Sequence, residues 1–261
     1  CMSTRTQGNK RLDISAPCKD FALSRLLPSK YGGKLQNPRP GFAGKHGHVL
    51  VQCMAVTAWV LEFNPDCEVL NENLKFDDMK QDWDTMCFAY GLPLIVDAAD
   101  HSFTRRVRAY WLTWDLPGYQ ALIEGFSPGD ASLCLDEGRT AEPYKVDGKD
   151  TIRTIGASWY GNPDFPIADT SVPVLVHDVL CEKAQQLRVE EAEELFGLPR
   201  GITAGRGVSN KDRLRGLGDG WDFRVLMMIN RTSKLARVNI TGPVFLPTKD
   251  TDQALAVQND L

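Results

Sequence analysis

The stretch RLDISAPCKDFALS, residues 11–24, carries the first structural signal in the sequence. Residues 12–17 alternate between apolar and polar side chains, which predicts a short strand that ends at the proline. Most unpaired cysteines are buried and inert, and Cys18 taken alone fits that description. Ligands of α/β sheets gather at the carboxyl ends of strands, however, so we test whether Cys18 is a nucleophile.

Strand-like and helix-like runs alternate from here to residue 114. Helices are predicted over 48–63 and 74–91, the second closed by Gly91, and strands over 67–73, 92–98 and 106–114. The first helical run is apolar on most faces, which favours burial against a sheet. Alternating strands and helices imply parallel crossover units, so the fold class is α/β.

Beyond this segment the pattern divides the chain into further parts. Residues 1–114 form the main part of the α/β domain, and 115–186, rich in Gly, Pro and Asp, predict a smaller lobe of short strands. Residues 187–231 return to the α/β domain with a helix over 189–197 and helical character over 210–231, and 232–261 form a tail.

Charge, cysteine content and hydropathy indicate which partners and which cellular compartment suit this chain. The formal net charge of −4 argues against a uniformly basic nucleic-acid coat but leaves room for local basic patches. Seven cysteines without a CxxC pair cannot all form disulfides within one chain, which favours a reducing, nuclear or cytoplasmic compartment. No apolar leader or membrane-spanning run is visible in the sequence, so we expect an intracellular protein that does not enter a membrane.

Four further features follow Pro17-Cys18 in order. They are Glu72-Asn73 at the end of a predicted strand, Arg106 and Arg108 within RVRAYW, the segment 190–203 (EEAEELFGLPRGIT), and the glycine-containing turn 218–221. Each has an ordinary structural explanation on its own, such as a turn or a solvated basic strand. Together they resemble the cytosine-5 DNA methyltransferases over residues 12–230, and the phrasing is most similar to the eukaryotic de novo class.

The resemblance implies a partial Rossmann-like methyltransferase sheet with a small target-recognition lobe. It also implies covalent chemistry, because carbon 5 of cytosine accepts a methyl group only after a nucleophile has added at carbon 6. Cys18 matches that nucleophile, and Glu72 matches the acid that hydrogen-bonds ring nitrogen 3. Arg108, with Arg106 behind it, is expected to hold the base carbonyl oxygen and to orient Glu72 around a base flipped out of the duplex.

The cofactor implied by the resemblance is S-adenosylmethionine. The residues that match its binding motifs are Pro17, Asn73, Gly218, Asp219, Gly220 and Trp221. The family's glycine-rich cofactor turn is not found in residues 1–11, and Asp219 stands where Asn or Arg is usual. We therefore expect a second polypeptide or a missing N-terminal segment to complete the sheet and the cofactor site, since an uncovered strand edge invites pairing.

Local charge points to double-stranded DNA as the partner. Basic residues in the Gly/Pro-rich segment after Cys18, a predicted lid, and near the last motifs are candidates for phosphate contacts: Lys19, Arg25, Lys30, Lys34, Arg200, Arg206 and Lys211. Two alternatives stay open. The chain could be a non-catalytic methyltransferase-like subunit of a larger assembly, or the same chemistry could act on RNA.

Overall fold

The computed structural model describes residues 10–18, 20–22, 39–114, 129–141, 145–146, 149–152 and 175–233. These residues fall into two compact units, the first drawn from 1–96, 107–117 and 232–238 and the second from 97–106, 118–231 and 239–261. Residues 19 and 23–38 of the predicted lid, which spans 19–47, and the part of the predicted tail after residue 233 lie outside the described residues.

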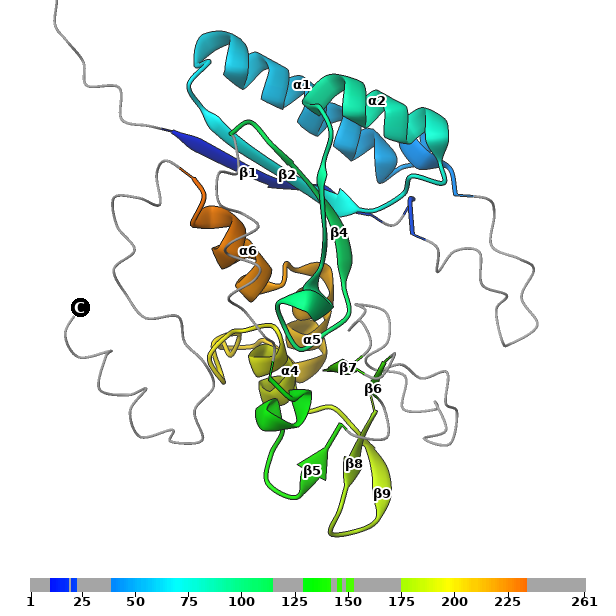
Figure 1. The fold of residues 1–261 in the computed structure, drawn as a ribbon, viewed down its shortest axis with the longest axis vertical. Coiled ribbons are helices and arrows are strands. Elements are labelled where there is room, and N and C mark those ends of the chain that lie inside the picture. The colour runs from blue at the N-terminus through cyan, green and yellow to red at the C-terminus, as the bar shows by residue number, and fades with distance from the viewer. Residues whose placement is uncertain are drawn as a thin grey trace, which may run out of the picture. The chain divides into compact units, whose positions relative to one another are not determined.

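The first unit is built on a four-stranded mixed sheet in the order β1-β2-β4-β3 (Figure 1). The strands are β1 (Arg11–Ser15), β2 (Glu68–Leu74), β3 (Leu94–Asp97) and β4 (Val107–Leu112). Strand β1 runs parallel to β2, as a crossover through a helix requires, and Ser15 lies opposite Glu72 in the register. The α/β prediction is therefore confirmed.

Strand β4 corrects the expectation of parallel crossovers throughout, because it runs antiparallel to β2. The connection 98–106 explains this difference, since it holds only the 3-10 turn η3 (Ala98–Asp100) and is too short for a crossover helix. As a result, the start of β4 meets the end of β2, with Arg108 opposite Leu74.

Two helices cover the sheet of the first unit. Helix α1 (Gly47–Phe63) follows the 3-10 turn η2 (Gly41–Ala43), and α2 (Lys80–Tyr90) ends at Gly91, whose φ of 83° places it in the left-handed region. The shared core consists of Ala16, Phe21, Leu50, Phe76, Met86, Ala109 and Trp111. Both predicted helices thus form, the second starting six residues later than expected.

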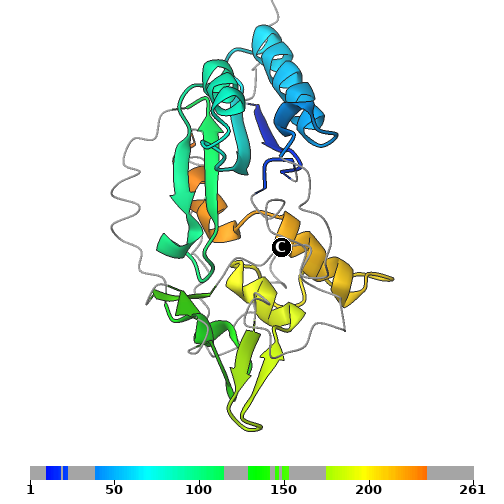
Figure 2. The same ribbon diagram turned by 90° about the vertical axis from the view of Figure 1, so that its right-hand side faces the viewer.

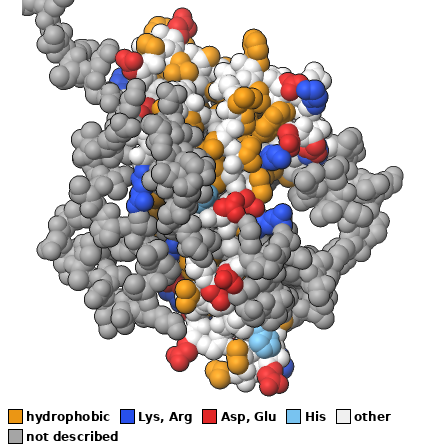
Figure 3. Space-filling model, in the orientation of Figure 1, with side chains coloured by type: hydrophobic (Ala, Val, Ile, Leu, Met, Phe, Trp, Pro, Cys, Tyr) orange, Lys and Arg blue, Asp and Glu red, His pale blue; other side chains and the backbone are white. Residues whose placement is uncertain are grey.

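Helix α1 is less buried than its apolar sequence predicts. Only Gly47, Leu50 and Thr57 are buried, whereas Trp59 is 61% and Phe63 70% exposed. Hydrophobic side chains accordingly gather over the α1 and α2 part of this unit in Figure 3. Within the described ranges no helix has both the length and the apolar character needed to cross a membrane.

The described part of the second unit combines short antiparallel strands with three α-helices and 3-10 turns. Its strands are β5 (Arg139–Thr140), β6 (Lys145–Val146), β7 (Lys149–Ile152), β8 (Leu175–Asp178) and β9 (Lys183–Gln186), and its helices are η4 (Ala131–Cys134), α4 (Val189–Leu195), α5 (Asn210–Asp219) and α6 (Phe223–Asn230). The β8–β9 hairpin lies next to α4 in both ribbon views (Figure 2). Residues from the predicted lobe, such as Ile152, and from the helices, such as Leu195, share one core.

Candidate active site

Strand β1 leads directly to the predicted nucleophile. Cys18 follows the strand by three residues and its side chain is half-buried. Asn73 of β2 steadies this strand end, because its Nδ2 donates a hydrogen bond to the carbonyl oxygen of Ala16 at 3.5 Å. The Glu-Asn motif therefore has a structural link to the Pro-Cys motif, through the residue that precedes Pro17.

Glu72 sits at the same edge of the sheet, held by two side chains from the neighbouring strands. Ser15 Oγ donates a hydrogen bond to Glu72 Oε2 at 2.7 Å, and Arg108 Nε lies 3.0 Å from Glu72 Oε1. The Glu72 and Arg108 side chains are both buried. The geometry thus brings together the predicted acid and the arginine expected to orient it, as charge-assisted hydrogen bonds do.

Ser15 is a member of this group that sequence reasoning missed. Ser15 lies in the stretch RLDISAPCKDFALS, but its role depends on the parallel register that places it opposite Glu72. Serine hydroxyls are common in strands, so no local signal separates this one from a solvated residue. Its single donated bond fixes which oxygen of Glu72 remains for Arg108.

Arg106 has different partners from Arg108. It belongs to the second unit, where its guanidinium donates to the carbonyl oxygens of Gly218, at 3.3 Å, and of Gly220. The predicted cofactor turn, from Gly218 to Trp221, is thereby fixed at the end of α5. A role of Arg106 beside Glu72 stays a prediction, whereas its hold on the turn is observed.

Asp222 directly follows this turn and caps helix α6. Its Oδ1 accepts hydrogen bonds from the backbone N–H groups of Arg224 and Val225, at 3.1 and 3.2 Å. Complete burial raises the pKa of Asp222 to about 6. An Asp directly before an apolar helical run is an N-cap signal, so this residue could have been found in the sequence.

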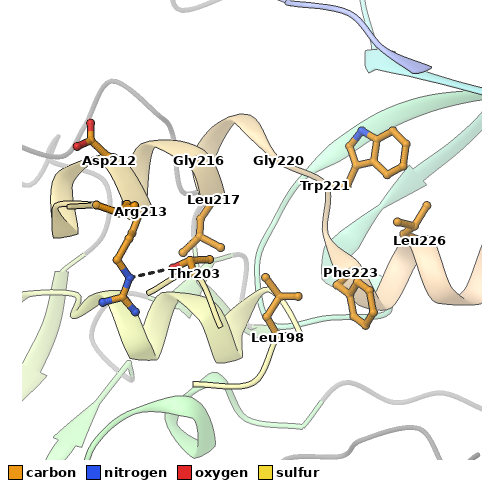
Figure 4. Close-up of a pocket in the computed structure, with 11 residues that line it drawn as sticks. Leu198, Thr203, Asp212, Arg213, Gly216, Leu217, Gly220, Trp221, Phe223 and Leu226 are labelled. Carbon is orange, nitrogen blue, oxygen red and sulfur yellow. Dashed lines mark hydrogen bonds between the residues drawn. The ribbon is translucent and has the colours of Figure 1, made fainter. Parts of the chain in front are cut away.

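A cavity of about 450 Å³ lies beside the turn, within the second unit (Figure 4). Gly220 and Trp221 contribute to its wall, together with apolar side chains that include Leu198, Leu217 and Phe223. The pocket is therefore mostly apolar and takes in two of the residues predicted to bind the cofactor. Cavities of this size suit a small organic group.

The basic residues predicted to contact DNA phosphates differ in exposure and in their partners within the protein. Lys19, Arg25, Lys30 and Lys34 lie outside the described residues, while Arg206 and Lys211 are exposed. Arg200 pairs with Asp136 and, at 3.0 Å, with Glu194. Although burial alone would lower it, hydrogen bonds to Glu194 and Asp136 raise the pKa of Arg200. This guanidinium is engaged within the protein.

Comparisons with known proteins give a likeness of fold. Neither a protein-family model nor a curated protein sequence matches this chain. A methyltransferase of Entamoeba histolytica, EhMeth, superposes with a TM-score of 0.53 and 13% identity, covering 85% of this chain and 76% of that one. The Dnmt2 methyltransferase of Schizosaccharomyces pombe (S. pombe) gives a TM-score of 0.49 and 12% identity, covering 74% of each chain. The chain is therefore similar in fold to a solved methyltransferase.

Proposed function

We propose that the chain is the catalytic and target-recognition part of a DNA (cytosine-5)-methyltransferase that uses S-adenosylmethionine. The observation that carries the proposal is the buried group formed by Ser15, Glu72 and Arg108 beside the strand end that presents Cys18. A methyltransferase fold supports the reaction class. The order of the motifs along the sequence supports cytosine as the target base.

In this mechanism the thiolate of Cys18 attacks carbon 6 of a flipped cytosine, forming a carbon–sulfur bond. Glu72 hydrogen-bonds ring nitrogen 3 and stabilises the electron pair that attack displaces toward it. Arg108 holds Glu72 in position and approaches the base carbonyl oxygen. After methylation, a water molecule takes the proton from carbon 5, the electron pair of that bond forms the 5,6 double bond, and Cys18 leaves as the thiolate.

S-adenosylmethionine supplies the methyl group in this chemistry. The turn from Gly218 to Trp221 would hold it, since Gly220 and Trp221 line an apolar cavity whose wall suits the flat adenosine part of that molecule. Arg106 keeps the turn in place through the Gly218 and Gly220 carbonyl groups. Asp219, the departure from the family pattern, lies at the end of α5 with a half-exposed side chain.

Trapping with 5-fluorocytosine tests the function, because fluorine on carbon 5 cannot leave and the Cys18 adduct persists. We expect a covalent complex with duplex DNA and S-adenosylmethionine that Cys18→Ala abolishes and that Cys181→Ala, at an exposed cysteine in the second unit, leaves intact. An adduct with 5-fluorocytosine RNA and none with DNA would assign the chemistry to RNA. Absence of any adduct, with the sheet completed as below, would favour a non-catalytic subunit.

We also propose that a polypeptide adds a strand parallel to β1 and a helix over α1. Strand β1 is the terminal strand of its sheet, and α1, which crosses over from β1 to β2, exposes Val51, Val56, Trp59 and Phe63 with only one charged residue, Glu62, along its length. Helices that are apolar all round are normally buried. A further segment of the same protein and a separate chain would present the same chemistry.

Light scattering during size-exclusion chromatography tests this surface. We expect the chain to self-associate and Trp59→Lys with Phe63→Lys to restore a monomer, since the exposed apolar area is removed. Two further experiments separate a segment of the same protein from a separate chain. If the segment belongs to the same protein, a longer form should be monomeric without the substitutions. If it belongs to a separate chain, that chain should co-elute with this one after co-expression. A wild-type chain that is monomeric and stable by itself would contradict the proposal.

A further inference from the structure

A buried carboxylate lies two residues after Cys18. Asp20 is 2% exposed, and its Oδ2 accepts hydrogen bonds from the backbone N–H groups of His46, at 2.6 Å, and Gly47, at 2.9 Å. Its own carbonyl oxygen accepts a bond from Gly41 N at 3.3 Å. The chain just after Cys18 is therefore fastened to residues 41–47 by both its side chain and its backbone.

These bonds satisfy the beginning of helix α1. The first N–H groups of a helix have no partner within the helix and carry a partial positive charge, which a carboxylate stabilises. Residue His46, at the N-cap of α1, makes no side-chain capping bond of its own. Asp20 supplies the missing acceptor from 26 residues away along the chain.

The segment that receives Asp20 has no room for side chains at three of its positions. A Cβ on Gly44 would lie 2.2 Å from Asp20 Oδ2, and one on Gly47 would lie 1.8 Å from the carbonyl oxygen of Gly41. Gly41 itself has a φ of +56° and would place a Cβ 1.7 Å from Asp82 Oδ2. Of these glycines, Gly44 lies directly against the Asp20 carboxylate, while Gly41 and Gly47 let the segment fold closely against Asp82 and against its own backbone.

Cys18 consequently lies between two fixed points. Before it, Asn73 holds the carbonyl oxygen of Ala16. After it, Phe21 N donates to the Cys18 carbonyl oxygen at 3.0 Å, and the Phe21 ring packs 4.5 Å from the ring of Phe76 in the core. The half-buried thiol is carried on a short span whose second anchor includes Asp20.

We propose that Asp20 is a positioning residue that holds Cys18 at the catalytic edge of the sheet by capping α1. The inference rests on the proposed function for the nucleophilic role of Cys18. Asp20 acts through the backbone and touches neither substrate nor cofactor in this proposal. Its effect is therefore on the geometry and exposure of the thiol.

Alkylation of Cys18 by iodoacetamide, followed by peptide mass spectrometry, tests the inference without DNA or cofactor. We expect Asp20→Ala to raise the Cys18 rate constant about tenfold, the scale of a lost helix cap. Asp20→Asn keeps an oxygen acceptor and should stay within about threefold of the wild type. Reaction at exposed Cys181 should not change, which separates a local effect from general unfolding.

Two glycine variants provide a matched pair if Asp20→Ala fails to fold. The Gly44 φ of −78° suits alanine, but the added Cβ of Gly44→Ala would displace the Asp20 carboxylate. We therefore expect Gly44→Ala to raise the rate constant of Cys18 alkylation as Asp20→Ala does. Gly216→Ala in α5 meets no atom within 4 Å and should leave the rate unchanged. Cys18 rates within twofold of the wild type in both Asp20→Ala and Gly44→Ala would overturn the proposal.

Trapping distinguishes this inference from the proposed function. Asp20→Ala should slow adduct formation with 5-fluorocytosine DNA while leaving DNA affinity unchanged, and Asp20→Asn should recover most of the rate. An altered alkylation rate with no adduct in any variant would retain Asp20 as the anchor of Cys18 and reject the methyltransferase activity. Normal adduct formation in Asp20→Ala would reject the positioning role alone.

Discussion

Replacing Arg108 by methionine tests the central ion pair. The Arg108 and Glu72 side chains are only 10% and 6% exposed, so water screens their attraction little. Removing the guanidinium leaves a buried carboxylate that keeps its hydrogen bond from Ser15, and breaking such a pair costs about 3–5 kcal/mol of unfolding free energy. Because Ser15 still donates a hydrogen bond to Glu72, we expect a loss of about 3 kcal/mol.

Urea unfolding followed by circular dichroism measures this loss. The midpoint should fall by about 1–3 M, given slopes of about 1–3 kcal/mol per M. The double variant Arg108→Met with Glu72→Gln should regain at least half of the lost unfolding free energy, since it no longer buries an uncompensated charge. The exposed pair Lys80–Asp84, with side chains 84% and 56% exposed, is the control, and Lys80→Met should cost about 0.5 kcal/mol or less. A similarly small loss for Arg108→Met would refute the argument.

Three further predictions concern charge and pKa. Arg200→Ala should lower the thermal midpoint with DNA affinity unchanged, because Arg200 is bound within the protein, whereas Arg206→Ala should weaken DNA binding and reduce its salt slope by about one. Burial raises the pKa of Asp222 to about 6, so the unfolding free energy should fall by about 3 kcal/mol as the pH rises from about 4 to 6. Denaturation at a series of pH values measures this fall, and Asp222→Asn should make it smaller. Burial also raises the pKa of Cys134 to about 12, so alkylation at pH 8 should spare Cys134 and modify Cys181; equal labelling of the folded protein would contradict this.

Local patterns predicted most of the secondary structure because their causes are local. Helix α2 ends at Gly91 and α4 is followed by Gly197, both with positive φ, which glycine alone adopts without strain. Strand-like runs in the sequence located β1, β2 and β4 within two residues of their observed bounds. The exposure of α1 was not predictable from its sequence, since periodicity shows that a helix is apolar and leaves open what covers it.

The antiparallel direction of β4 was also beyond local reasoning. The segment between the predicted strands 92–98 and 106–114 is visibly short, but strand order and direction depend on which neighbour supplies the hydrogen bonds. That direction decides that Arg108 meets Glu72, because the start of β4 lies against the end of β2. The family resemblance had grouped Arg106 with Arg108, whereas the structure shows Arg106 donating to the carbonyl oxygen of Gly218.

The sequence by itself determined the α/β class, through short-range periodicity, and the order of the motifs. The candidacy of Cys18, Glu72 and Arg108 came from the resemblance of that motif order to a known family. Only the tertiary structure decided how the candidates are held. Ser15 reaches Glu72 through strand register, and Asp20 reaches Gly47 through a fold that brings together residues 27 positions apart. Hydrogen bonds and ion pairs act over a few ångströms in space, whatever the distance along the chain, so these partners become visible only after folding.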